Sequence, residues 1–220
     1  MKGRTIFLII ALIVLADQAI KIYVKTHFYI GESRAVAGNW FQLYFIENEG
    51  MAYGWKFGGD WGKILLTLFR LAAVIFGVFY IKTLLEKKYP SGFIICVALV
   101  FAGALGNLID SMFYGMIFDN SSTLTSNVAK LFPAHGYGEF LHGRVVDMFY
   151  FPLIRVESMP AWIPFLGGKD FTFFNYIFNL ADASISIGVL TILFCRRHFF
   201  KEYPEKESSQ NVEAVSLANN

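Results

Sequence analysis

The sequence predicts a membrane protein, an all-α bundle of four transmembrane helices with a small β-structured platform on the periplasmic side. Three observations lead to this prediction. The 220 residues are 55% hydrophobic and 18% aromatic, with a mean hydropathy of +0.48, which exceeds the usual composition of a soluble domain. Four apolar runs reach the roughly 20 residues that a spanning helix needs. The segment NWFQLYFIEN alternates apolar and polar residues, as strands do.

The predicted spans cover residues 5–24, 64–84, 93–114 and 174–194. The first run follows Lys2 and Arg4, as the core of a signal peptide would, but ADQAIK offers no small-x-small cleavage site. We therefore predict that it remains as a span. Residues 1–201 are expected to form one membrane domain, followed by a polar, disordered cytoplasmic tail over residues 202–220.

Basic residues near the span ends predict the orientation, because cytoplasmic loops carry the excess of Lys and Arg. They occur at the N-terminus, between spans two and three, and after span four: Lys2, Arg4, Lys82, Lys87, Lys88, Arg196, Arg197 and Lys201. Both termini are then cytoplasmic, and two long outer segments, residues 25–63 and 115–172, face the periplasm. The first holds the strand-like NWFQLYFIEN and several glycines. We interpret the Val-Val and aromatic run of the second, in GRVVDMFYFPLIRV, as returning the chain to the membrane.

Polar residues inside the spans are costly and usually functional. Asp17, Arg70, Asn107, Asp110 and Asp182 all interrupt apolar runs. At 1.5 Å per residue, Asp17 lies roughly 10 Å and Asp182 about 12 Å inside the outer ends of their spans. These depths predict one polar layer and a pocket that opens outward.

Spacing along the helices groups some of these residues. Asp17 and Lys21 are four residues apart, and Asn107 with Asp110 and Asn179 with Asp182 are three apart, so each pair shares a helix face. A structural role as interhelical contacts is an equally good interpretation for Asp17 and Lys21. Asp182 has no basic residue on its own span and needs a proton or a partner from elsewhere.

The histidines show no metal-ligand spacing. The two cysteines fall on spans, where a thiol behaves as a small hydrophobic group. We therefore expect no metal, no other cofactor and no nucleic-acid partner.

Five ordered blocks resemble those of the bacterial lipoprotein signal peptidases (signal peptidase II), which are membrane-embedded aspartyl peptidases. The blocks are DQAIK at 17–21, FIENEGMAYG at 45–54, GALGNLID at 103–110, GRVVDMF at 143–149 and FNLAD at 178–182. The resemblance implies that Asp147 and Asp182 are the catalytic pair. It also implies supporting or substrate-binding roles for Asp17, Lys21, Asn48, Gly50, Asn107, Asp110 and Asn179.

The implied activity is an endopeptidase that removes the signal peptide of a prolipoprotein just before its diacylglyceryl-modified cysteine. Two carboxylates that share a proton activate water in such a reaction. The implied location is the bacterial inner membrane, with prolipoproteins and membrane lipid as partners. Globomycin-type cyclic peptides are implied as inhibitors.

The chain departs from the family pattern in two places. Ser111 stands where the family usually has an arginine after the aspartate of GNLID, and we hypothesise that Arg70 supplies the missing charge. An insert over residues 117–140 precedes the fourth block and is expected to shape access to the site. The alternatives are a small proton-coupled transporter or channel, in which intramembrane polar residues line an ion path, and a structural membrane scaffold, which leaves Asp182 unexplained.

Overall fold

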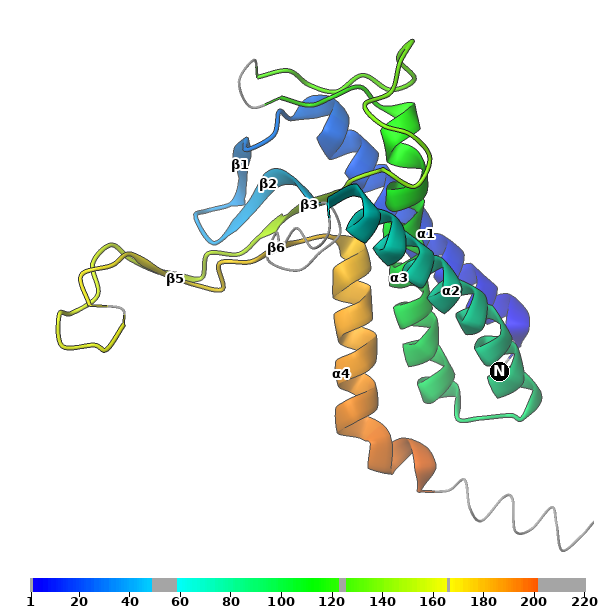
Figure 1. The fold of residues 1–220 in the computed structure, drawn as a ribbon. Coiled ribbons are helices and arrows are strands. Elements are labelled where there is room, and N and C mark those ends of the chain that lie inside the picture. Colours follow the sequence, from blue (N-terminus) through cyan, green and yellow to red (C-terminus); the bar gives the residue numbers. More distant parts are fainter. Residues whose placement is uncertain (1, 49–58, 123–125, 166, 202–220) are drawn as a thin grey trace, which may run out of the picture. The chain divides into compact units, whose positions relative to one another are not determined.

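The computed structural model describes residues 2–48, 59–122, 126–165 and 167–201. In these ranges it has four long apolar helices, α1 (Gly3–His27), α2 (Gly59–Glu86), α3 (Ser91–Ile117) and α4 (Leu180–Phe200) (Figure 1). Each is long and apolar enough to cross a membrane. The predicted four-span bundle is thereby confirmed.

The start that we predicted for the fourth span is wrong. Residues 174–179 of the predicted span are not helical: Ile177–Phe178 forms strand β6, and Phe171–Phe173 just before the predicted start forms strand β5. Asp182 therefore lies in the first turn of α4 and not about 12 Å inside a helix. Aromatic residues suit strands as well as apolar helices, and a short apolar run does not distinguish the two.

The β-structured part is a four-stranded antiparallel sheet with the order β1-β2-β3-β6. Its first three strands are β1 (Ser33–Ala37), β2 (Phe41–Asn48) and β3 (Val145–Tyr150). The strand predicted in NWFQLYFIEN is β2. The Val-Val and aromatic run that we expected to return to the membrane is instead β3, a central strand paired with β2 and β6. Its burial on both faces explains why its sequence is almost continuously apolar.

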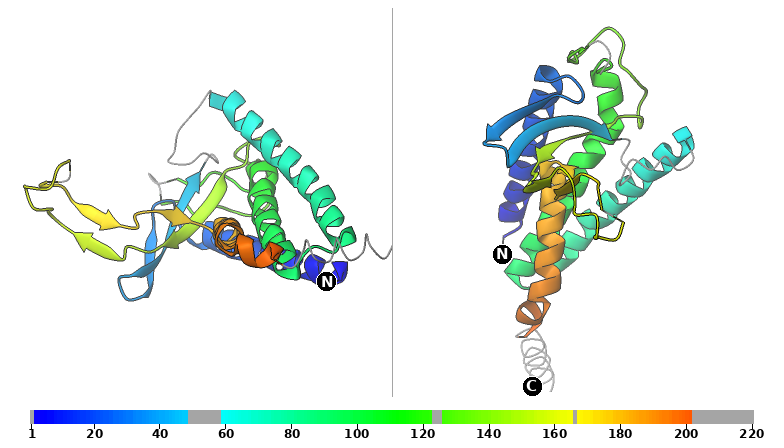
Figure 2. Two further views of the ribbon diagram at one scale, coloured as in Figure 1. Left: turned by 90° about the horizontal axis from the view of Figure 1, so that it is seen from below. Right: turned by 90° about the vertical axis from the view of Figure 1, so that its left-hand side faces the viewer.

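A separate two-stranded ribbon is formed by the segment between β3 and β6. Strand β4 (Ile154–Val156) pairs with β5 in antiparallel register. In the ribbon drawings this hairpin extends away from the four-stranded sheet as an arm (Figures 1 and 2).

The chain forms two compact units, and α1, α2 and α3 each contribute to both. The first comprises the described residues of 1–15, 70–106 and 181–220, with a core made of Ile6, Ile81, Leu84, Phe93, Ile94 and Ala98. Two glycines let α3 and α4 approach closely. A Cβ at Gly103 would collide with the backbone oxygen of Ala181, and one at Gly188 would lie 2.6 Å from the oxygen of Cys96. Small residues commonly allow such packing between membrane helices.

The second unit comprises residues 16–69 and 107–180 and carries the sheet. Its core joins α1, α3, β2, β3 and the insert, through Val24, Phe28, Phe45, Tyr114, Phe118, Ala129, Val146 and Met148. The backbone at Gly143 packs directly against the backbone of α3. A Cβ at this position would collide with the backbone oxygen of Asp110, so only glycine fits. The sheet and the polar ends of α1 and α3 are thus built into one unit.

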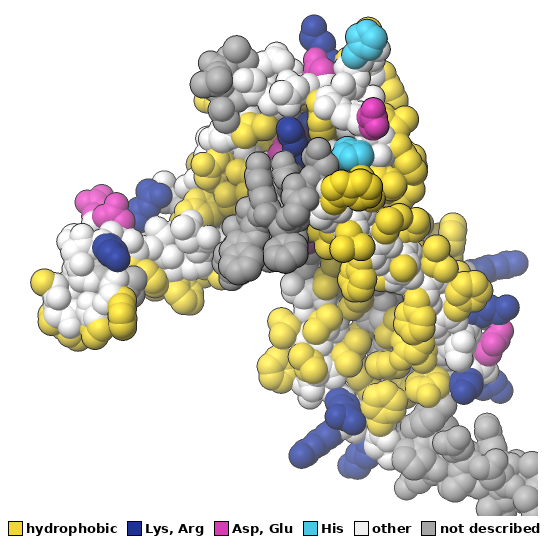
Figure 3. Space-filling view, in the orientation of Figure 1, with side chains coloured by type: hydrophobic (Ala, Val, Ile, Leu, Met, Phe, Trp, Pro, Cys, Tyr) yellow, Lys and Arg dark blue, Asp and Glu magenta, His cyan; other side chains and the backbone are white. Residues whose placement is uncertain are grey.

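The outward faces of the spans are apolar. Leu12, Phe76 and Phe194 are 67%, 67% and 84% exposed, and hydrophobic side chains cover much of the helical surface in Figure 3. Such exposure suits contact with lipid acyl chains.

Candidate active site

The buried ammonium of Lys21 is the centre of a polar network in the second unit. Its Nζ lies 2.8 Å from Asp17 Oδ2 and 2.8 Å from Asp110 Oδ2, and it donates a hydrogen bond to Asn107 Oδ1 at 2.9 Å. All four side chains are buried. The helical spacings predicted that Asp17 shares a face of its helix with Lys21, and that Asn107 shares one with Asp110. The packing of α1 against α3 brings these two pairs together.

Gln18 adds a second bridge between the same helices. Its Nε2 donates to Asp110 Oδ1 at 2.8 Å and to Asp17 Oδ2 at 3.2 Å, while its Oε1 accepts from the hydroxyl of Tyr114 at 3.1 Å. Our sequence analysis did not select Gln18. Its position inside the DQAIK block was the available signal.

The network continues to Asp147 through Asn179. The Nδ2 of Asn179 donates to Asp147 Oδ1 at 2.7 Å, with Asn107 Oδ1 at 3.1 Å and the backbone oxygen of Val146 at 3.3 Å as further acceptors. Strand β3 positions Asp147, whose side chain is buried. Asp110 Oδ2 also accepts from the backbone nitrogen of Val146 at 3.4 Å. Lys21, Asn107, Asn179 and Asp147 therefore form one continuous path of contacts.

Four further predicted site residues are Asp182, Arg70, Asn48 and Gly50. Asp182 is in the first turn of α4, three residues after Asn179, and belongs to the other compact unit. Arg70 on α2 also belongs to that unit. Asn48 ends β2 opposite Val145, and Gly50 lies outside the described residues.

Ser111 is buried, and its hydroxyl donates to the backbone oxygen of Asn107 at 2.9 Å. It thus supports its own helix. The positive charge beside Asp110 is supplied by Lys21.

A second charged cluster, which we call the Lys25 cluster, lies one helical turn further along α1. The buried Nζ of Lys25 pairs with Glu47 on β2 and lies 3.3 Å from Ser121 Oγ. Arg144 pairs with the other Glu47 oxygen at 3.2 Å. The ammonium lies over three aromatic rings, those of Phe45, Phe118 and Tyr137, at 5.0 to 5.9 Å from their centroids.

Tyr137 connects this cluster to the insert. Its hydroxyl accepts from the backbone nitrogen of Arg144 at 2.7 Å, and burial raises the pKa of that hydroxyl, so it remains protonated. Our sequence analysis missed the cluster. The signal was the four-residue spacing of Asp17, Lys21 and Lys25, which places all three on one helix face.

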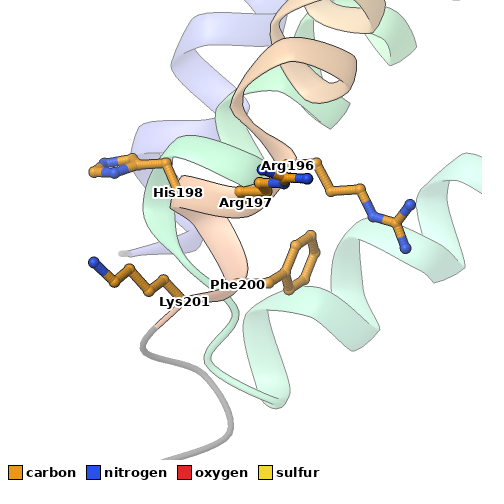
Figure 4. A pocket seen from close by; sticks show the side chains of 5 residues that line it. All are labelled: Arg196, Arg197, His198, Phe200 and Lys201. Carbon is orange, nitrogen blue, oxygen red and sulfur yellow. The ribbon is translucent and has the colours of Figure 1, made fainter.

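No group of three or more His, Cys, Asp or Glu side chains in the described part of the chain could hold a metal ion. Cys96 and Cys195 are free thiols. A surface hollow at the end of α4 is lined by Arg196, Arg197, His198, Phe200 and Lys201, whose side chains spread in different directions (Figure 4). It is a cationic helix end without a carboxylate among its lining residues, and we do not assign the chemistry to it.

These features define a class of protein, a multi-pass membrane enzyme whose buried polar network ends on a carboxylate. The signal peptidase (SPase) II family model matches residues 9–197. The lipoprotein signal peptidase of Porphyromonas gingivalis is 45% identical over 196 residues, covering 88% of this chain and 83% of that protein. The lipoprotein signal peptidase of Amoebophilus asiaticus is 32% identical over 204 residues, covering 91% and 81%.

A solved bacterial membrane enzyme superposes with a TM-score of 0.54 at 25% identity, covering 89% of this chain and 90% of that one. A second such structure gives a TM-score of 0.52 at 26% identity, covering 87% and 92%. The chain belongs to the signal peptidase II family and is a peptidase. Neither the family match nor these relatives support the transporter alternative.

Proposed function

We propose that this peptidase removes the signal peptide of diacylglyceryl-modified prolipoproteins, cutting just before the lipidated cysteine by an aspartic mechanism. Prolipoprotein processing follows from membership in the signal peptidase II family. The aspartic chemistry and its assignment to Asp147 and Asp182 are the proposed part. Residues 1–201 act in it as one peptidase domain.

In this mechanism the two carboxylates hold one proton between them and activate a water molecule. One carboxylate takes a proton from the water while the other donates to the oxygen of the scissile carbonyl. Water oxygen bonds to the carbonyl carbon, the peptide C–N bond then breaks, and the leaving amine takes up a proton. The titration belongs to the pair and not to either residue.

The observation that carries the proposal is the hydrogen bond from Asn179 to Asp147. Asn179 joins β6 to α4 and precedes the helix, and Asp182 follows it by three residues. Because β6 pairs with β3 at Phe149 and Tyr150, the chain that leads into Asp182 is anchored to the strand that carries Asp147.

The test is cleavage of a lipid-modified prolipoprotein by purified Asp147→Asn and Asp182→Asn variants. An amide can neither take nor deliver the required proton, so each variant is expected to lose cleavage while keeping the wild-type thermal unfolding profile. Asp170→Asn, on the exposed hairpin, is the matched control and should remain active. Turnover above a few per cent of wild type in either site variant would remove that aspartate from the dyad.

The supporting residues have distinct proposed roles. Lys21 bridges Asp17 and Asp110 and orients Asn107, while Asn107 and Asn179 orient Asp147. The end of β2 at Asn48, together with Gly50, is proposed to hold the extended substrate backbone. Globomycin-type peptides are proposed to compete for that same place.

The orientation is likewise proposed. The basic end of α4 (Figure 4) and the other basic loops support cytoplasmic termini, and with them a periplasmic position for the sheet and the active site. Reporter fusions after Lys201 and within residues 118–140 test this orientation, since only the second should be active as a periplasmic reporter.

Position 111 is a serine in this chain and usually an arginine in the family. Arg70 is proposed to supply the positive charge of that arginine. Arg70→Leu should then lower cleavage, and adding Ser111→Arg should restore part of it, because two positions that act on one network are not additive. The idea is abandoned if Arg70→Leu is fully active, or if the double variant is no better than the single one.

A further inference from the structure

The β4–β5 hairpin has one apolar and one polar face. Its cross-strand pairs are Ile154 with Phe173, Arg155 with Thr172, and Val156 with Phe171. Side chains alternate between the two faces of a strand, so the first and third pairs share a face and the Arg155–Thr172 pair lies on the other. On the apolar face, Ile154 is 58% and Phe173 50% exposed.

The tip of the hairpin presents further aromatic side chains. Trp162 is 81% and Phe165 93% exposed. The neck of this loop is closed by backbone hydrogen bonds from Met159 to Lys169 at 3.0 Å and from Gly168 to Met159 at 2.8 Å. Phe165 has a φ of 67°, which is unfavourable for a bulky residue. Strained positions commonly mark functional sites, and the side chain at this one is an exposed apolar ring.

Aromatic packing continues from the hairpin into the sheet. Phe178 on β6 contacts Phe174 at 6.1 Å and Phe151 at 5.7 Å between ring centroids, and Phe151 stacks on Phe41 at 4.7 Å. Trp40, which is 53% exposed, joins this row through Phe151 at 6.1 Å. The hairpin is therefore continued by an aromatic row that runs from Phe174 through Phe178 and Phe151 to Phe41 and Trp40.

Charged and apolar side chains separate on the arm. Its exposed charged residues are Arg155, Glu157, Lys169 and Asp170. In Figure 3 hydrophobic side chains gather at the end and along the lower side of the arm, and charged ones mostly along its upper side. A two-stranded hairpin alone is marginally stable in water, so an amphipathic one needs a surface for its apolar face.

We propose that this hairpin is an interfacial anchor that lays its apolar face and aromatic tip into the surface of the lipid bilayer. Trp and other aromatic residues favour the headgroup region of a membrane, and amphipathic elements lie in the interface plane with the apolar side down. The hairpin ends seven residues before Leu180, where the spanning helix α4 starts, so its base is tethered near a membrane boundary. This inference does not depend on the assignment of the catalytic aspartates.

Tryptophan fluorescence tests the anchor in the full chain. Replacing Trp40, Trp55 and Trp61 with Phe leaves Trp162 as the single probe. In vesicles whose phospholipids carry bromine in the upper part of the acyl chains, Trp162 should lose most of its fluorescence relative to unbrominated vesicles, and acrylamide in the water should quench it weakly. A variant that keeps only Trp61, where the apolar span of α2 starts, gives the reference for a membrane position.

Paired substitutions on the two faces provide the matched comparison. Ile154→Ser with Phe173→Ser should reduce quenching by brominated lipid and increase quenching by acrylamide. Arg155→Ser with Thr172→Ser, on the opposite face, should leave both unchanged. All variants should cleave prolipoprotein in detergent, which shows that they are folded and that the peptidase site is intact.

Three outcomes would overturn the proposal. If Trp162 is insensitive to brominated lipid and open to acrylamide, the tip lies in water. If it is shielded from both quenchers, it packs against protein, such as a second copy of the chain. If both pairs of substitutions change the quenching of Trp162 to the same extent, the apolar face of the hairpin is not the one that contacts lipid.

Discussion

Asn179 shows how much of this site depends on one amide group. Its Nδ2 is the donor that reaches Asp147, and the same group lies within hydrogen-bonding distance of Asn107. Asn107 in turn accepts from Lys21, whose charge is shared by Asp17 and Asp110. A buried ion pair loses its stability when one partner is removed, because the other charge remains unpaired. The orientation of Asp147 is thus held by residues that need not contact substrate.

The first prediction at this scale is that Asn179→Asp lowers kcat with a much smaller effect on KM. The substitution keeps the shape of the side chain but replaces the donor with an acceptor opposite Asp147. A hydrogen bond to a charged group contributes about 1.5–3 kcal/mol, so kcat should fall roughly 10- to 100-fold at about 1.4 kcal/mol per tenfold change. Steady-state cleavage of a lipidated substrate measures both constants.

Asn175→Asp is the matched control. Asn175 lies four residues earlier, and its Oδ1 accepts from the hydroxyl of Tyr150 at 3.0 Å, a role that a carboxylate retains. This variant should keep wild-type kcat. Wild-type kcat in Asn179→Asp would mean that Asn179 does not orient the reacting carboxylate.

At the scale of elements, the Lys25 cluster joins four segments of the second unit. Lys25 comes from α1, Glu47 from β2, Ser121 and Tyr137 from the insert, and Arg144 from the residue before β3. The insert is therefore tied to the strand that carries Asp147 through charge and ring contacts. Cation and ring contacts of this kind strengthen when they are desolvated.

We predict that Lys25 and Glu47 are energetically coupled. Lys25→Met leaves the Glu47 carboxylate buried without its main partner, whereas Lys25→Met with Glu47→Gln removes both charges. The double variant should be less destabilised than the sum of the two single ones, with a coupling of about 0.5–3 kcal/mol. Chemical unfolding in detergent measures the coupling, and proteolysis within residues 118–140 should be fastest in Lys25→Met.

The exposed pair Lys82 and Glu86 is the control, studied by the same double-mutant cycle of two single variants and one double variant. Its atoms are 3.8 Å apart, and its side chains are 74% and 63% exposed, so the coupling should be close to zero. Equal coupling in the two cycles would contradict a special role for burial in the Lys25 cluster.

At the scale of the whole molecule, the chemistry is predicted to need neither a metal nor a thiol. Chelators should leave cleavage unchanged, and the Cys96→Ala and Cys195→Ala variants should remain active, because the proposed mechanism uses only two carboxylates and water. Cleavage by the purified peptidase with and without chelator, and after thiol alkylation, measures this. Loss of activity on chelation that zinc reverses would argue for a metallopeptidase instead.

The sequence by itself determined that the chain has four apolar helices, and it determined the pairing of polar residues along α1 and α3; Asn179 precedes α4, so the helix face predicted for Asn179 and Asp182 was wrong. Hydropathy over about 20 residues and a period of 3.6 are properties of the local chain, so the four helices and the shared faces of Asp17 with Lys21 and Asn107 with Asp110 could be predicted. The alternation in residues 41–48 likewise predicted β2.

Only the tertiary structure decided where α4 begins and what surrounds Asp147. Phe171–Phe173 and Ile177–Phe178 are strands because β4 and β3 pair with them, and an apolar window carries no information about a pairing partner. The contacts from Lys21 to Asn107 and from Asn179 to Asp147 join residues that are 86 and 32 positions apart. Local periodicity places side chains on faces, but only the packing of elements decides which faces meet.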